Sequence, residues 1–135
     1  MRNHRDTERT EAGENELTHA VIGAAIHVHR QLGPGLLEVV YAQCMRRELE
    51  RRGIEFEREV FAPIYYEGSR LETQLRIDLV IEKALIVELK AVPVLLPVHT
   101  AQLLSYLKLT GLHLGLLINF NVEILVHGVR RVING

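Results

Sequence analysis

The chain has 135 residues, of which 47% are apolar and 24% are charged, and its 16 basic and 17 acidic residues give a formal charge of −1. A chain of this length and composition can bury one hydrophobic core, which excludes a wholly disordered or collagen-like protein and favours one globular domain. The balanced charge also excludes a uniformly basic surface, so any contact with nucleic acid must be confined to a local patch.

Cysteine content and the N-terminal residues indicate a compartment. The single cysteine, Cys44, cannot form an intramolecular disulfide, which favours a reducing environment. The first 15 residues are charged where a secretory signal would be apolar, and no apolar run reaches the ~20 residues of a membrane span. We therefore expect a cytoplasmic protein that does not enter a membrane.

The N-terminal half is predicted to be helical. Residues 1–14 contain few apolar side chains, so we expect them to form a mobile tail ahead of a single domain over 15–135. From Leu17, apolar residues recur at spacings of three and four, which predicts an amphipathic helix that ends at Gly33. A second helix is predicted over 36–52. The side chains expected to face the core from this helix are Leu37, Val40, Tyr41, Cys44, Met45 and Leu49.

Beyond the second helix, the period of the apolar residues changes to two, which is typical of strands. Pro63 indicates that the first of these strands is an edge strand or begins irregularly, because proline has no N–H to donate to a ladder. The predicted elements, in chain order, are strands over 60–66, 71–81 and 84–90, a helix over 99–110, and strands over 114–119 and 122–126. This order predicts an α/β fold with a central mixed β-sheet flanked by helices.

Two acidic residues interrupt strands that are otherwise apolar. Burying a carboxylate is costly unless it is paired, binds a metal or lines a cleft, so Asp78 and Glu88 require an explanation. Alternation along the strand places Glu88 and Lys90 on one face, about 6 to 7 Å apart. If the two strands form a hairpin, Asp78 lies near Glu88, and two carboxylates and an ammonium converge on one patch.

This combination suits phosphodiester hydrolysis. Carboxylate oxygens bind Mg²⁺ or Mn²⁺, the ion polarises the phosphate and acidifies a bound water, and a lysine can orient that water. A Glu-x-Lys pattern alone is also common on exposed strands, so the spacing leaves an ordinary surface strand open.

Several ordered motifs make a family resemblance specific. Asp78, followed by Glu88-Leu89-Lys90 and by a helix that carries Gln102 and Tyr106, resembles the PD-(D/E)XK nuclease superfamily. The segment 35–41 (GLLEVVY) matches the G-x-x-E-x-x-Y signature of the small bacterial GxxExxY family, which is placed in that superfamily. The segments ELKAV (88–92), QLLSYLK (102–108) and LLINF (116–120) are similar to the same family.

The resemblance covers roughly residues 16–126 and implies a restriction-endonuclease-like core with a metal-dependent site. It implies that Asp78 and Glu88 bind the metal and that Lys90 is catalytic. The other residues implied are Leu89 as a backbone carbonyl ligand, Glu38 as an additional carboxylate near the metal, and Gln102 and Tyr106 as a pair that borders the site. The proline that names the motif is replaced by Ile77, at a position that supplies backbone shape and no ligand.

The residues taken alone allow plainer interpretations. Glu38 lies in the first turn of its helix, where a carboxylate favours the macrodipole. Tyr106 and Gln102 could be a core aromatic and a surface polar residue. Arg46 and Arg47 are interleaved with acidic residues, which is typical of a solvated helix face, although they are also the candidate nucleic-acid contacts.

Two histidines and the cysteine receive no functional role. His27 and His29 are two residues apart on a helix and point away from each other, so they cannot chelate one ion. Cys44 is expected to be a small core residue.

The leading function is a Mg²⁺- or Mn²⁺-dependent nuclease, whose partner is a nucleic acid, with DNA as the first candidate and RNA as the second. The alternative is a non-catalytic module that binds nucleic acid or protein on the same fold, and a homodimer is left open. A degenerate domain is expected to have lost Asp78, Glu88 or Lys90, and all three are present. The weak basic footprint of a chain with a formal charge of −1 favours the alternative.

Overall fold

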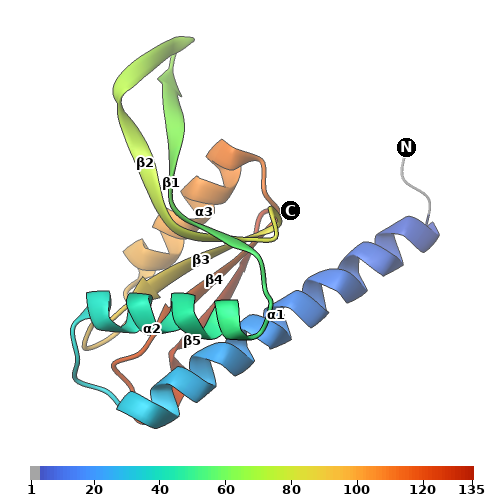
Figure 1. Cartoon of the computed structure of the whole chain (residues 1–135). Helices are drawn as coiled ribbons and strands as arrows, with labels where there is room; N and C mark the ends of the chain where they lie inside the picture. Colours follow the sequence, from blue (N-terminus) through green and yellow to red (C-terminus); the bar gives the residue numbers. More distant parts are fainter. Residues whose placement is uncertain (1–3) are drawn as a thin grey trace.

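The computed structural model describes the backbone of residues 4–135 and the side chains of residues 13–135. One five-stranded sheet lies at the centre, with helices on both faces (Figure 1). The elements in chain order are α1 (His4–Leu32), α2 (Glu38–Arg51), β1 (Phe56–Tyr66), β2 (Ser69–Ile81), β3 (Leu85–Lys90), α3 (Pro97–Thr110), β4 (Leu114–Asn119), the 3₁₀ turn η1 (Leu125–Gly128) and β5 (Val129–Ile133). None of the helices described is both long and apolar enough to cross a membrane.

The sheet is mixed, as predicted. Its strand order is β1-β2-β3-β4-β5, and β3 and β4 are parallel while the other neighbouring pairs are antiparallel. A parallel pair needs a crossover connection, and α3 supplies it between β3 and β4. Gly111 ends α3 as its C-cap in the left-handed conformation, with φ 75°, which a glycine adopts without strain.

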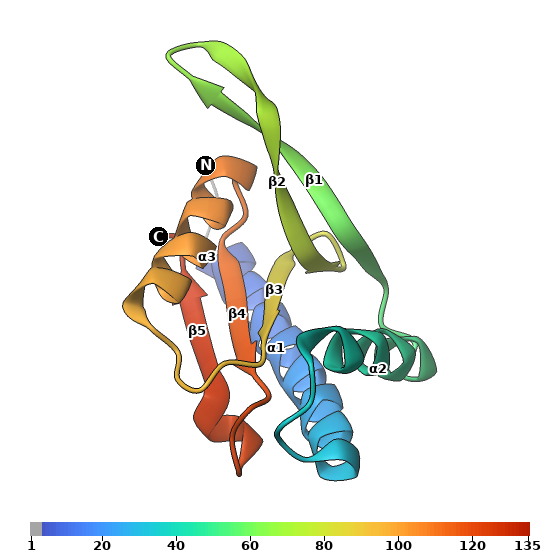
Figure 2. The same ribbon diagram turned by 90° about the vertical axis from the view of Figure 1, so that its left-hand side faces the viewer.

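Two apolar layers hold the helices on the sheet (Figure 2). On one face α1 and α2 pack against the sheet, and the ring of Tyr41 stacks on that of Phe120 with centroids 4.6 Å apart. On the other face α3 inserts Leu103 and Leu107 against the sheet. Gly115 allows this contact, because a Cβ atom there would lie 2.9 Å from a methyl group of Leu103.

The hairpin of β1 and β2 forms an arm that projects beyond the other strands (Figures 1 and 2). The two strands pair along their whole length, whereas β2 pairs with β3 only over Leu79–Ile81. β1 is an edge strand, as Pro63 predicted, and its register shifts between Pro63 and Tyr65. The point where β2 leaves β3 is therefore the junction between the arm and the body.

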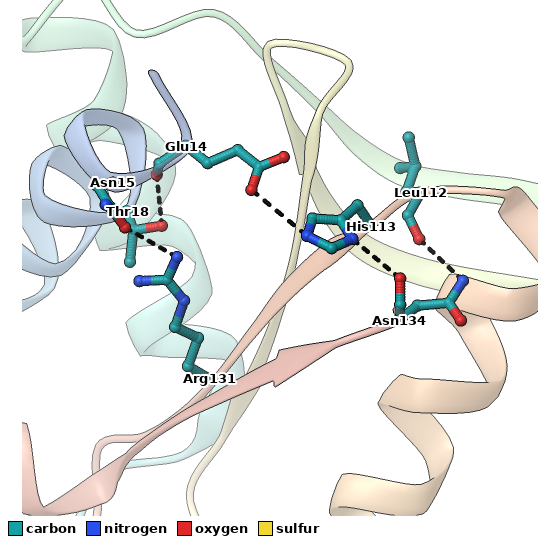
Figure 3. Close-up of polar contacts among 7 residues, drawn as sticks. All are labelled: Glu14, Asn15, Thr18, Leu112, His113, Arg131 and Asn134. Atoms are coloured by element: carbon teal, nitrogen blue, oxygen red, sulfur yellow. Dashed lines mark hydrogen bonds and ion pairs between the residues drawn. The ribbon is translucent and has the colours of Figure 1, made fainter. Parts of the chain in front are cut away.

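Polar contacts fasten α1 to the far edge of the sheet (Figure 3). Arg131 on β5 donates to Asn15 Oδ1 at 2.9 Å, and His113 Nε2 lies 3.6 Å from Glu14 Oε2. These contacts join the expected start of the domain to its last strand. α1 itself begins at His4 and so runs through most of the tail predicted over 1–14, while residues 1–3 lie outside the described part of the chain.

The prediction of a strand over 122–126 is wrong. After β4 the chain forms a loop and the turn η1, and β5 is the strand that pairs with β4. The loop is held in place by other contacts: the Val122 carbonyl lies 2.7 Å from His29 Nε2, and Leu125 is buried in the core on the α1 side. Leu125 and the Val122 carbonyl therefore anchor a loop, while Ile124 and Val126 are exposed.

Two predictions for α2 are also wrong. Leu37 is 73% exposed, because it precedes the helix as its N-cap residue. Glu48, predicted on a solvated face, is buried against α1. Arg52 Nε donates to Glu48 Oε2 at 2.7 Å, and this hydrogen bond lowers the pKa of Glu48, with further help from Arg51 and His27.

Candidate active site

The site forms where β2 leaves β3. The last backbone pair between them is Leu79 with Val87, and beyond it side chains replace the ladder. The Asp78 N–H donates to Glu88 Oε2 at 2.8 Å, and the Leu89 N–H donates to Asp78 Oδ2 at 2.9 Å. The predicted proximity of Asp78 and Glu88 is confirmed, and each carboxylate is held by a backbone amide of the opposite strand.

The backbone carbonyl of Leu89 is turned toward the same opening. The Lys90 carbonyl accepts from the Phe120 N–H at 2.9 Å, so the backbone of Lys90 faces β4. Successive residues of a strand direct their backbone groups to opposite edges, and the Leu89 N–H already binds Asp78 on β2. The Leu89 carbonyl therefore points to the edge that β2 has left.

The two carboxylates are crowded and poorly hydrated. Glu88 is only 4% exposed, and burial, together with the nearby charge of Asp78, raises the pKa of Glu88 to about 8. The hydrogen bond from the Asp78 N–H opposes the rise. Two carboxylates in such a site resist being ionised together, and a bound cation removes that cost.

Glu38 reaches this site from the first turn of α2. It lines a cleft of about 350 Å³ together with Asp78 and Leu89. Burial raises the pKa of Glu38, and the charge of Asp78 raises it further, so the two carboxylates sense each other across the cleft. Across residues 13–135, however, no three His, Cys, Asp or Glu side chains are arranged to hold an ion.

Lys90, Gln102 and Tyr106 lie on the α3 side of the site. Lys90 Nζ donates to Gln102 Oε1 at 3.4 Å, which links β3 to α3. Tyr106 follows one turn later on the helix. Burial and the charges of Glu88 and Asp78 raise the pKa of Tyr106, whereas the Gln102 side chain opposes the rise. The structure thus brings all six predicted side chains to one region.

Tyr41 does not belong to that region. Tyr41 is fully buried, as predicted for a core residue of this helix, whereas Glu38 is exposed in the cleft. The Tyr41 hydroxyl donates to the Gly33 carbonyl at 2.6 Å and accepts from the Leu36 N–H at 3.2 Å. Tyr41 therefore holds the turn that sets where α2 and Glu38 begin.

The sequence pattern did not indicate a role for Asn119. Its amide side chain interrupts the apolar segment LLINF, as Asp78 interrupts an apolar strand, and this was a signal that could have found it. Asn119 is fully buried and lies opposite Lys90 in the register of β3 and β4. Its side chain accepts from the Val92 N–H at 3.0 Å and donates to the Val92 carbonyl at 2.9 Å. This pair of bonds fixes the chain directly after Lys90.

Arginines gather beside the cleft. Arg46 and Arg76 line it, and Arg76 lies 3.0 Å from Glu59 as an ion pair. Arg46 also lines a neighbouring hollow of about 520 Å³, so the two cavities share this side chain. The lining residues of this arginine groove are Gln43, Arg46, Arg47, Glu50 and Arg58.

A mixed sheet flanked by helices, with carboxylates where two strands part, defines a restriction-endonuclease-like α/β domain. The family model described as the PD-(D/E)XK nuclease superfamily matches residues 15–132. The chain therefore belongs to the PD-(D/E)XK nuclease superfamily. The narrower resemblance to the GxxExxY family and the domain bounds 15–135 stay predictions.

A solved structure supports the fold. The crystal structure of SSO0001 is similar, with a TM-score of 0.56 and 20% sequence identity. The similarity covers 71% of this chain and 49% of that protein, so the chain spans about half its length. A comparison with curated protein sequences gives no match.

Proposed function

We propose that this protein is a Mg²⁺- or Mn²⁺-dependent nuclease that hydrolyses phosphodiester bonds in DNA or RNA. The observation that carries the proposal is the pair of carboxylates, Asp78 and Glu88, held by backbone amides where β2 leaves β3. Lys90 follows two residues later on the same face of β3 as Glu88. Membership of a nuclease superfamily supports this interpretation.

The residues present fit a divalent cation. Mg²⁺ is usually held by one or two carboxylates and completes its shell with water, so a cluster of three carboxylates is not required. Asp78 and Glu88 would hold the ion with the Leu89 carbonyl. Burial and the charge of Asp78 raise the pKa of Glu88 even though the charge of Lys90 lowers it, and a bound cation would offset that repulsion. When bound, the ion would polarise the phosphate and lower the pKa of a water.

The remaining side chains orient the reacting groups. Gln102 accepts from the Lys90 ammonium and so holds it beside the carboxylates, where it can orient a water and offset negative charge on the phosphate. Tyr106 stays protonated at neutral pH and can donate a hydrogen bond. Glu38 faces Asp78 from the other wall of the cleft, where its carboxylate can bind a water of the metal shell.

The arginine groove supports a polyanionic substrate. Arg46, Arg47 and Arg58 line one hollow with a single acidic residue, Glu50. None of these three arginines forms an ion pair with another side chain of residues 13–135. Converging guanidinium groups repel one another unless an anion lies between them, and phosphate is an anion that guanidinium groups bind well. The groove adjoins the cleft at Arg46, so a chain bound there would reach the carboxylates.

The experiment that tests this proposal measures cleavage of single- and double-stranded DNA and RNA with Mg²⁺, with Mn²⁺ and with EDTA. We expect cleavage with either ion, none with EDTA, and none in Asp78→Asn or Glu88→Gln. The matched control is Glu82→Gln, an exposed carboxylate in the turn between β2 and β3, which should cleave like the wild type. Binding of the oligonucleotides without cleavage under any metal would favour the non-catalytic module.

A further inference from the structure

Three aromatic rings on β1 are exposed, those of Phe61, Tyr65 and Tyr66, and Phe61 is the one nearest the base of the arm. Phe61 on β1 is 59% exposed, in a strand that otherwise packs one face against the body. Exposing a phenyl ring to water forfeits the stabilisation that its burial would bring. A surface aromatic beside polar groups is therefore a candidate contact for another molecule.

The sheet register places Phe61 beside the cleft, next to one of its lining residues, Arg76. Phe61 is the direct partner of Arg76 on β2, and paired residues of antiparallel strands project from the same face. Arg76 lines the cleft together with Asp78. Residues two apart on a strand lie about 6 to 7 Å apart on one face, so Phe61 is within one nucleotide's reach of the carboxylates.

The opposite face of the arm holds it in place. Val60 and Ala62, the neighbours of Phe61 along β1, pack against the apolar layer that contains α3. Ile77, the partner of Val60 on β2, is fully buried in that layer. The base of the arm is therefore anchored, and the Phe61 ring is presented outward from a supported strand.

We propose that Phe61 is a stacking platform for an unpaired base next to the phosphate that is cut, so that the substrate is single-stranded nucleic acid. This inference rests on the proposed nuclease function. Every base has a face that can stack on an aromatic ring, and in a duplex that face is occupied by the neighbouring base pair. The arginine groove begins at Arg46 in the same cleft and supplies the positive charge that a nucleic-acid strand requires.

A tryptophan in place of Phe61 reports the stacking directly. The chain contains no tryptophan, so Phe61→Trp introduces the only indole. The measurement uses this substitution together with Lys90→Ala and Mn²⁺, so that a six-nucleotide DNA strand stays intact while it is titrated. We expect the single strand to quench the fluorescence of the introduced indole. A strand that lacks bases and a blunt duplex should each quench it less.

Affinity gives the second readout. In the Lys90→Ala background, Phe61→Ala should weaken binding of the single strand by roughly 5- to 150-fold, the range found for loss of one base–aromatic stack. Affinity for a duplex should not change, and Phe61→Trp should restore single-strand binding. The matched control is Tyr66→Ala, an exposed aromatic at the end of the arm that pairs with Ser69, roughly 20 Å from Arg76 along the strand.

Three results would overturn the inference: absence of quenching, no binding of any oligonucleotide, or an equal loss of single-strand and duplex affinity in Phe61→Ala. Sedimentation of the wild type and Phe61→Ala tests a second copy as the occupant. Dissociation of a dimer by Phe61→Ala would assign the ring to a dimer interface instead. Because binding is measured without cleavage, a protein that stacks bases but never cuts would refute the nuclease proposal and leave Phe61 as a base-stacking contact for single-stranded nucleic acid.

Discussion

Glu88 makes the stability of the metal-free protein depend on pH. Its pKa is raised to about 8 by burial and by Asp78, whereas in the unfolded chain a glutamate titrates near ~4.3. Between these two values the folded protein retains a proton that the unfolded chain releases. The free energy of unfolding should therefore decrease as the pH rises from about 4 to about 8.

The size of this effect follows from the difference between the two pKa values. Each unit corresponds to roughly 1.4 kcal/mol, so the wild type in EDTA should lose on the order of a few kcal/mol between pH 5 and pH 8 because of Glu88. Glu88→Gln, which cannot ionise, should lack this component and should be the more stable protein at pH 8. Mn²⁺ should stabilise the wild type at pH 8 and not the variant.

Urea unfolding at pH 5, 6, 7 and 8 in EDTA measures both proteins. Because the two proteins differ only at residue 88, the difference between their pH profiles reports the Glu88 carboxylate together with its repulsion by Asp78. Glu82→Gln, at an exposed position of the same hairpin, should follow the wild type. Parallel profiles for the wild type and Glu88→Gln would refute the reasoning.

Three further predictions concern metal binding, catalysis and positioning. Asp78→Ala and Glu88→Ala should each weaken Mn²⁺ binding in calorimetry, and unchanged affinity in both would remove the metal site. Lys90→Ala should keep Mn²⁺ affinity near that of the wild type and lower the cleavage rate by roughly 10² to 10⁴. Lys90→Arg should recover only part of the lost rate, and a wild-type rate in Lys90→Ala would exclude a catalytic lysine. Asn119→Ala should lower the free energy of unfolding by about 1 to 3 kcal/mol in urea, because the Val92 backbone loses both hydrogen bonds to this buried side chain and keeps only the one from Asn121. A smaller change would show that water replaces the lost bonds.

The local residue pattern was sufficient to predict that Asp78 and Glu88 lie close together. Asp78 and Glu88 were recognisable because charge in an apolar strand is costly, and the short turn between the strands brings them together. The helices and the first four strands followed from apolar periodicity in the same way. These features depend on residues close in sequence.

What the sequence did not reveal depends on contacts between distant residues. The strand predicted over 122–126 is a loop because His29, 93 residues earlier, binds the Val122 carbonyl. Glu48 is buried because α1 packs over it, and its neighbours along α2 are charged like those of an exposed helix. The projecting arm follows from the separation of β2 and β3 at Asp78, which no local periodicity records.

Metal-dependent cleavage by one preparation tests the central claim most directly. Wild-type protein is incubated with labelled single-stranded DNA in Mn²⁺, then with excess EDTA, and then with Mn²⁺ restored, beside Asp78→Asn purified in the same way. The account predicts cleavage that stops with EDTA, resumes with Mn²⁺, and is absent from the variant throughout. Cleavage that persists in EDTA, or that Asp78→Asn retains at the wild-type rate, would contradict it.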